Sequence, residues 1–198
     1  MNVDTSDVAA PPAIAPARRR LPGDGHMWVM IIGDLFIFGV YFVTYMVFRA
    51  MSRDSFVRSQ HHLNNTVGVV NTLIMLTSSM TIALAAIAAR ERRLRSAQRL
   101  VWVTGALGGL FVLVKVFEWH EQIRNGHTVS DQFYSFYYVF TGVHLVHLLL
   151  GLIILGVVIR ELRNPRKQRA SIVEQGAIYW HMVDALWIVI FAILYLMR

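Results

Sequence analysis

Seven acidic and histidine residues stand out because each lies inside or at the end of an apolar stretch of the sequence. Asp34 stands alone among apolar neighbours, whereas the other six form pairs spaced three residues apart, so that each pair shares one face of a helix. Such side chains can bind a metal, ligate haem, move protons or hydrogen-bond across helices. The pairs are Glu118 with Glu121, His144 with His147, and His181 with Asp184.

A metal or haem site is the first chemistry to weigh. A carboxylate-bridged di-metal site in a helical bundle uses Glu-x-x-His pairs at one depth, and the sequence has no such pair. Two axial haem ligands must oppose each other, and a depth gap of about 12 Å between His147 and His181 argues against that pairing. Without cysteine, iron–sulfur and thiolate sites are excluded. We expect no metal ligand and no catalytic residue, and an independent haem or di-metal protein stays the alternative.

Depth along the helices divides the polar residues into two predicted levels. At about 1.5 Å per residue, Asp34, His181 and Asp184 lie roughly 8 to 12 Å from one end of their segments. Asp34 is a candidate proton-related carboxylate. The other polar residues are expected to hydrogen-bond across helices or to contact lipid headgroups, namely Glu118, Glu121, His144, His147, His181 and Asp184. The second level contains Glu118, His120, His144 and His147, with Glu121 just beyond.

Five apolar segments must position these residues. The chain has 198 residues, 56% of them hydrophobic and 16% charged, which is too apolar for a soluble core of this size. Each segment approaches the roughly 20 residues that a helix needs to cross a bilayer. We predict an all-α integral membrane bundle of five transmembrane helices over residues 26–198, after a disordered cytoplasmic tail over 1–25. The predicted spans are about 27–48, 67–89, 100–121, 138–160 and 176–197.

Arginine and lysine residues predict the orientation of this bundle. Most of them lie in the N-terminal tail and in the connections after the second and fourth spans, which five crossings place on one side. The positive-inside rule then puts the N-terminus in the cytoplasm and the C-terminus outside. The net charge of +7 is explained by orientation, so we expect no nucleic-acid partner. The opposite side holds only Arg49, Arg53, Arg58, Arg124 and Arg198.

Side chains near the span ends are predicted to meet the membrane interface. The indoles of Trp28, Trp102, Trp119 and Trp180 are expected to be interface anchors, since indoles prefer the headgroup region. Lys115 lies near a helix end, where its long stem would let the ammonium reach the interface.

The order and content of five stretches carry a family resemblance. The TGxHxxH element at Thr141 and the YWHxVDxxW element at Tyr179 are the most specific. With these motifs the chain resembles subunit III of the haem-copper oxidases, the third core subunit of cytochrome c oxidase, over residues 27–197. The stretches are WVMIIGDLFIFGVYFVTY from Trp28, NTLIMLTSSMTIA from Asn71, FEWHEQIRNGHTVSD from Phe117, YVFTGVHLVHLLLG from Tyr138 and EQGAIYWHMVDALWIVIFAILY from Glu174.

The resemblance covers the last five helices of the seven-helix family form. The sequence differs from the family pattern at Asp34. Family members usually carry a buried glutamate there, which weakens a proton role taken from the family. Short members occur among bacterial oxidases and among NorE-like proteins associated with nitric oxide reductase. The short loops and Asp34 look more like the NorE-like branch.

The resemblance implies a non-catalytic subunit or accessory protein in a bacterial cytoplasmic membrane. Its expected partner is the catalytic subunit of a haem-copper oxidase or nitric oxide reductase, which carries haem with copper or non-haem iron. This chain is expected to bind no cofactor itself, to stabilise that partner and to support its proton uptake in aerobic electron transport or denitrification. A phospholipid is a further candidate ligand.

Overall fold

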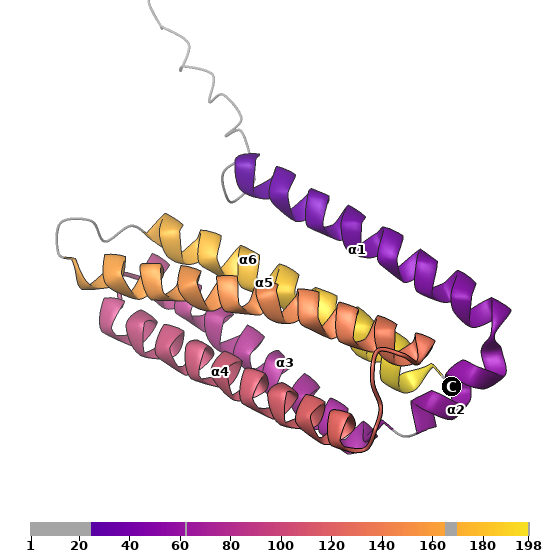
Figure 1. The fold of residues 1–198 in the computed structure, drawn as a ribbon. Helices are drawn as coiled ribbons and strands as arrows, with labels where there is room; N and C mark the ends of the chain where they lie inside the picture. The colour runs from indigo at the N-terminus through magenta and orange to yellow at the C-terminus, as the bar shows by residue number, and fades with distance from the viewer. Residues whose placement is uncertain (1–24, 62, 165–169, 198) are drawn as a thin grey trace, which may run out of the picture.

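The computed structural model describes residues 25–61, 63–164 and 170–197, and within them the chain is all helix without a strand. The predicted tail over 1–25 lies outside this description except for Gly25, which begins the first helix. Figure 1 shows the helices lying side by side as a bundle, with α1 at its edge. The elements are α1 (Gly25–Met51), α2 (Arg53–His61), α3 (Asn65–Arg90), α4 (Leu94–Arg124), α5 (Gln132–Arg163), α6 (Ala170–Phe191) and the π-helical turn η1 (Ala192–Leu196).

Five helices in the described part of the chain are long and apolar enough to cross a membrane, which confirms the predicted class of fold. They are α1, α3, α4, α5 and α6 with η1. The helices extend beyond the apolar runs because backbone hydrogen bonding continues into polar sequence. α5 begins at Gln132 rather than at residue 138, since the Asp131 carboxylate caps it by accepting from the Phe133 backbone N–H at 2.9 Å.

The short helix α2 was not predicted. It lies in the polar connection between the first two spans and is too short and hydrophilic to resemble a membrane helix. One apolar side chain, Phe56, is buried against Tyr45 and Phe133. The Gln60 amide also donates to the Leu194 carbonyl oxygen at 2.7 Å. These contacts hold α2 against α1, α5 and the C-terminal turn at one end of the bundle, as Figure 1 shows.

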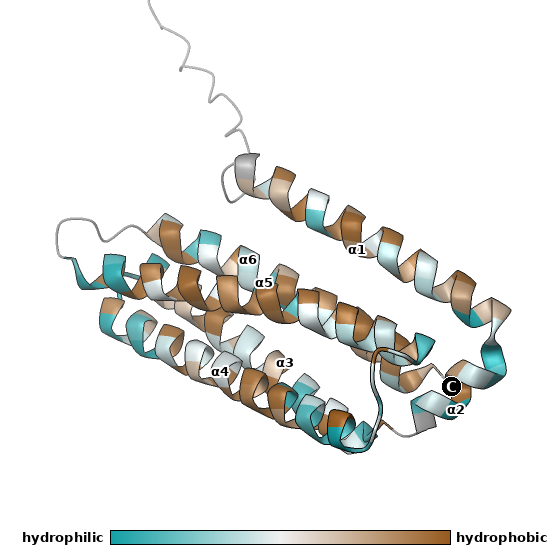
Figure 2. Cartoon of the chain, viewed as in Figure 1, coloured by the Kyte–Doolittle hydropathy of each residue, from teal (hydrophilic) through white to brown (hydrophobic). Residues whose placement is uncertain are grey.

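Burial is unequal among the helices. About 67% of the apolar window of α6 is buried inside the chain, against 17% for α1, because α6 packs between α3 and α5 whereas α1 lies outside them. The rings of Phe42 on α1 and Phe140 on α5 stack at a centroid distance of 5.3 Å. Figure 2 shows hydrophilic residues concentrated at helix ends and hydrophobic residues along the middles. The pattern leaves a broad apolar surface around a core centred on α6.

Close helix packing around α6 depends on glycine. The indole of Trp180 lies between Gly108 of α4 and Gly151 of α5, and a Cβ at Gly108 would come within 2.7 Å of that ring. Its Nε1–H donates to the Ser78 hydroxyl of α3 at 2.9 Å. The Trp180 side chain of α6 therefore contacts three other helices. Larger residues at Gly108 and Gly151 would occupy the space of its indole ring.

Candidate functional site

A buried ion pair lies in the core between α4 and the C-terminal turn. Lys115 Nζ donates to Glu118 Oε2 at 2.8 Å, and both side chains are almost fully buried. The Tyr195 hydroxyl accepts from Lys115 Nζ at 2.9 Å and donates to Glu118 Oε1 at 2.5 Å. We call these three residues the core ion-pair site. Each of the three side chains hydrogen-bonds to the other two. Charged groups that are buried away from water require such partners.

The prediction that Lys115 reaches the interface is wrong. Its side chain has a relative exposure of only 1%, and its ammonium lies over the rings of Tyr137 and Trp187 at 5.3 and 4.8 Å. The Glu118 carboxylate lies one turn further along the helix and forms an ion pair with the Lys115 ammonium. This ion pair and the contacts with the rings stabilise the ammonium in the core, in place of the water that would solvate it at the interface. The spacing of three residues between Lys115 and Glu118 could have indicated this ion pair from the sequence.

His144 lies beside the core ion-pair site. Its ring contacts Phe111 and Trp187 at centroid distances of 5.6 and 5.2 Å and is fully buried. Neither ring nitrogen has a hydrogen-bond partner among the described residues. His144 thus lies in an aromatic environment on α5, one turn before His147.

Asp34 and His147 meet between α1 and α5. His147 Nε2 lies 3.5 Å from Asp34 Oδ1, and the two side chains are 19% and 21% exposed. The prediction of different depths for these residues is therefore wrong. Because α5 begins at Gln132, His147 lies near the middle of that helix. The Tyr179 hydroxyl also donates to the His147 carbonyl oxygen at 3.1 Å, so that α6 is hydrogen-bonded to α5 at the position of the Asp34 and His147 pair.

His181 and Asp184 face α3. His181 Nδ1 lies 2.8 Å from the Ser79 hydroxyl and 3.9 Å from Asp184 Oδ2. Asp184 is buried, and neither of its carboxylate oxygens accepts a hydrogen bond from the described residues. Ser79 is not among the site residues predicted from the sequence. The contact shows that its hydroxyl is a partner of the predicted histidine.

The remaining predicted residues lie on or near the surface, with one exception. Glu121 is exposed on α4, and Trp102 is 53% exposed. Trp119 donates from Nε1 to the Thr141 hydroxyl at 3.1 Å. Trp180 is fully buried, so its prediction as an interface anchor is wrong, because glycines on two neighbouring helices admit the indole into the core. The anchor role of Trp28, Trp102 and Trp119 stays a prediction.

The three predicted intramembrane histidines contact different neighbours. His147 turns toward Asp34, His144 toward aromatic rings and His181 toward Ser79. In the described ranges no three histidine, aspartate or glutamate side chains come together as a metal would require. The predicted histidines therefore have separate partners within the described part of the chain.

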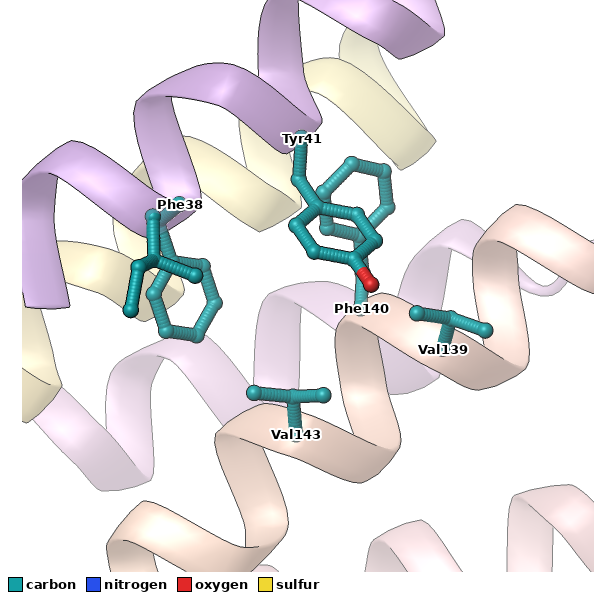
Figure 3. Close-up of a pocket in the computed structure, with 6 residues that line it drawn as sticks. Phe38, Tyr41, Val139, Phe140 and Val143 are labelled. Carbon is teal, nitrogen blue, oxygen red and sulfur yellow. The ribbon is translucent and has the colours of Figure 1, made fainter.

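An apolar pocket lies beside the Asp34 and His147 pair. Figure 3 shows Phe38 and Tyr41 of α1 across from Val139, Phe140 and Val143 of α5. The His147 ring itself contacts Phe38 at a centroid distance of 5.5 Å. The pair is thus shielded on one side by aromatic and branched side chains.

Comparison with known proteins connects this architecture to a family. Residues 25–198 match the family described as cytochrome c oxidase subunit III. The chain is 31% identical over 173 residues to the cytochrome c oxidase subunit 3 of Thermostichus vulcanus, covering 85% of this chain and 84% of that protein. It is 28% identical over 203 residues to the subunit of the same name in Corynebacterium diphtheriae, covering 99% and 98% of the two chains.

A third relative is the heme-copper oxidase subunit I+III of Aeropyrum pernix. It is 31% identical over 186 residues, which make up 86% of this chain and 22% of that longer protein. The family match and these relatives agree with the five apolar helices, and with the TGxHxxH and YWHxVDxxW motifs on α5 and α6. The chain belongs to the cytochrome c oxidase subunit III family, whose members are non-catalytic membrane subunits of haem-copper oxidase complexes.

Proposed function

We propose that this chain packs against the catalytic subunit of a haem-copper oxidase in a bacterial cytoplasmic membrane and stabilises it. The observation that carries the proposal is the unequal burial of the helices. α1 leaves most of its apolar surface uncovered, with Val29 73% and Phe36 72% exposed, while α6 is enclosed. Lipid and a larger membrane partner would cover this surface. The relative named subunit I+III supports the pairing, since by its name one polypeptide carries both subunits.

The proposed orientation has the N-terminus in the cytoplasm and the C-terminus outside after five crossings. The end of α3, the start of α4 and the end of α5 lie at one end of the bundle in Figure 1. Arginines are concentrated there, and the positive-inside rule favours the cytoplasm for that end. They include Arg90, Arg92, Arg93, Arg95, Arg99, Arg160 and Arg163.

The pair of Asp34 and His147 is the proposed contribution to proton uptake. His147 Nδ1 lies 2.8 Å from the Val143 carbonyl oxygen, so this nitrogen carries a proton and donates it. The neutral ring then presents the lone pair of Nε2 toward Asp34 Oδ1. This contact of a ring nitrogen with a carboxylate supports a role of the pair in proton exchange.

Purification of the tagged full chain from its native membranes in a mild detergent tests the partnership. The expected result is co-purification of a haem-containing catalytic subunit, seen as a Soret band that leaves with the partner when the complex is dissociated. Iron that stays with the isolated, monodisperse chain would contradict the proposal and support an independent haem protein. The identity of the captured subunit decides between an oxidase and the nitric oxide reductase that the short form and Asp34 suggested.

A further inference from the structure

A groove opens between α3 and α6, near the end of α3 and the start of α6. Its walls are small or branched apolar side chains, namely Ala83, Ala86 and Ile87 of α3 with Ala177 and Ile178 of α6. The groove has a volume of about 620 Å³ and is open to the surroundings. Small residues on a membrane helix let the backbone of another helix approach closely.

An ion pair closes one end of the groove. Arg90 Nε donates to Glu174 Oε1 at 2.7 Å, and both residues line the groove. The two charged groups therefore satisfy each other and hold α3 against α6 at this end. From Glu174, the groove runs along α6 as far as His181, which is roughly 10 Å deeper at about 1.5 Å per residue.

His181 brings a polar group to the deep end of this apolar groove. Its Nδ1 lies 2.8 Å from the Ser79 hydroxyl, while 42% of its side chain stays exposed. The part of the chain that the structure describes offers no hydrogen-bond partner to Nε2. A ring nitrogen without a partner is costly at membrane depth. The occupant of the groove must therefore bring a group that hydrogen-bonds to Nε2.

We infer that this groove is the docking site for a transmembrane helix of the catalytic subunit. That helix carries a hydroxyl or amide side chain at the level of His181, because such a group both donates and accepts and so suits either tautomer of the ring. A lipid acyl chain would fit the walls but leave Nε2 unbonded. Water would bond to Nε2 but not to the apolar walls. The inference rests on the proposed partnership and names the surface that serves it.

The outward face of α1 makes no comparable demand on its neighbour. It is lined by apolar side chains such as Phe36 and Val43, and the Thr44 hydroxyl there donates to the Val40 carbonyl oxygen of the same helix. Any apolar surface, from lipid or from a partner, satisfies such a face. Of these two surfaces, the groove is the one that selects a partner by polar chemistry.

Filling the groove tests the inference. In the tagged full chain, Ala83→Leu should lower recovery of the haem-containing catalytic subunit from native membranes on the order of tenfold. Ala106→Leu makes the same change at an exposed position of α4 and should leave recovery unchanged. Thermal unfolding of both purified variants should match the parent chain, which shows that each retains the fold.

Photo-cross-linking locates the contact without filling the groove. The photoreactive residue p-benzoylphenylalanine is introduced at Ile87 on the groove, or at Leu110 on α4 as the control, since these side chains are 47% and 44% exposed. Position 87 should cross-link to the catalytic subunit and position 110 should not. His181→Gln should retain more of that subunit than His181→Phe, because the amide can still hydrogen-bond to a docked helix.

The outcomes separate this inference from the partnership itself. Recovery of the catalytic subunit with Ala83→Leu as with the parent chain would overturn the docking site and leave the partnership standing. Cross-links from position 87 to lipid alone, or to a second copy of this chain, would do the same. Absence of the catalytic subunit from the parent preparation would overturn both.

Discussion

Lys115 and Glu118 form an ion pair of 2.8 Å one turn apart on α4, with side-chain exposures of 1% and 2%. Tyr195 completes the site from the C-terminal turn, with hydrogen bonds to both charged groups. A Cβ on Gly68 of α3 would lie 2.7 Å from the Tyr195 ring, so the tyrosine is held closely against a third element. The ion pair therefore joins α4 to the end of the chain rather than stabilising α4 alone.

Replacing Lys115 by Met should lower the free energy of unfolding by about 3 kcal/mol, because Glu118 would be left as an uncompensated buried charge. Thermal unfolding of the purified chain in detergent measures the change. The double variant K115M/E118Q is the control and should recover part of the loss, since it removes both charges. A single variant as stable as the parent would show that water or another group compensates Glu118.

Replacing Gly108 by Ala should destabilise the bundle by about 1 to 3 kcal/mol, because the new methyl group would overlap the Trp180 ring. Gly109→Ala is the matched control on the same helix, where the new Cβ meets no atom within 4 Å. The control should change stability by less than about 0.5 kcal/mol. The two variants are compared by thermal unfolding, and equal effects would contradict the close packing of Trp180.

Replacing Asp34 by Asn should leave assembly with the catalytic subunit intact and slow proton uptake by the assembled complex. The reason is that an amide cannot hold the proton that the pair with His147 is proposed to exchange. Stopped-flow measurement with a pH indicator follows the uptake. His147→Gln should have a similar effect. Thr44→Val is the control on α1, since among the described residues that hydroxyl bonds only to the Val40 carbonyl of its own helix. Unchanged uptake in Asp34→Asn would leave the pair a structural contact.

Replacing His181 by Ala should lower stability by about 1 kcal/mol and reduce the yield of the assembled complex, because the bond to Ser79 is lost. Asp184→Ala should act in the same direction, because it removes the carboxylate that lies 3.9 Å from His181 Nδ1. Turnover per assembled complex should be retained, and haem content provides the normalisation. The control is Thr77→Ala. Thr77 is an exposed residue of α3, and within the part of the chain that the structure describes its hydroxyl bonds only to the Leu73 carbonyl. Complete loss of turnover in fully assembled complex would instead indicate a catalytic role.

Several contacts could be anticipated only in part from the residue pattern. The spacing of His181 and Asp184 correctly predicted a shared face, since their side chains lie 3.9 Å apart. His144 and His147 have the same spacing, yet the His144 ring contacts Trp187 in the core while His147 meets Asp34 and Phe38 of α1. A spacing of three residues describes one helix. It contains no information on which neighbour lies on either side of that helix.

The sequence by itself determined the five apolar helices and the subunit III family, because length, hydropathy and short motifs are local properties of the chain. Only the tertiary structure decided that Asp34 meets His147, that Lys115 stays inside with Glu118 and Tyr195, and that Trp180 lies in the core. These outcomes depend on the axial offset between helices and on the space left by glycines of neighbouring helices. Both are properties of helix pairs, which the order of residues along a single helix does not specify.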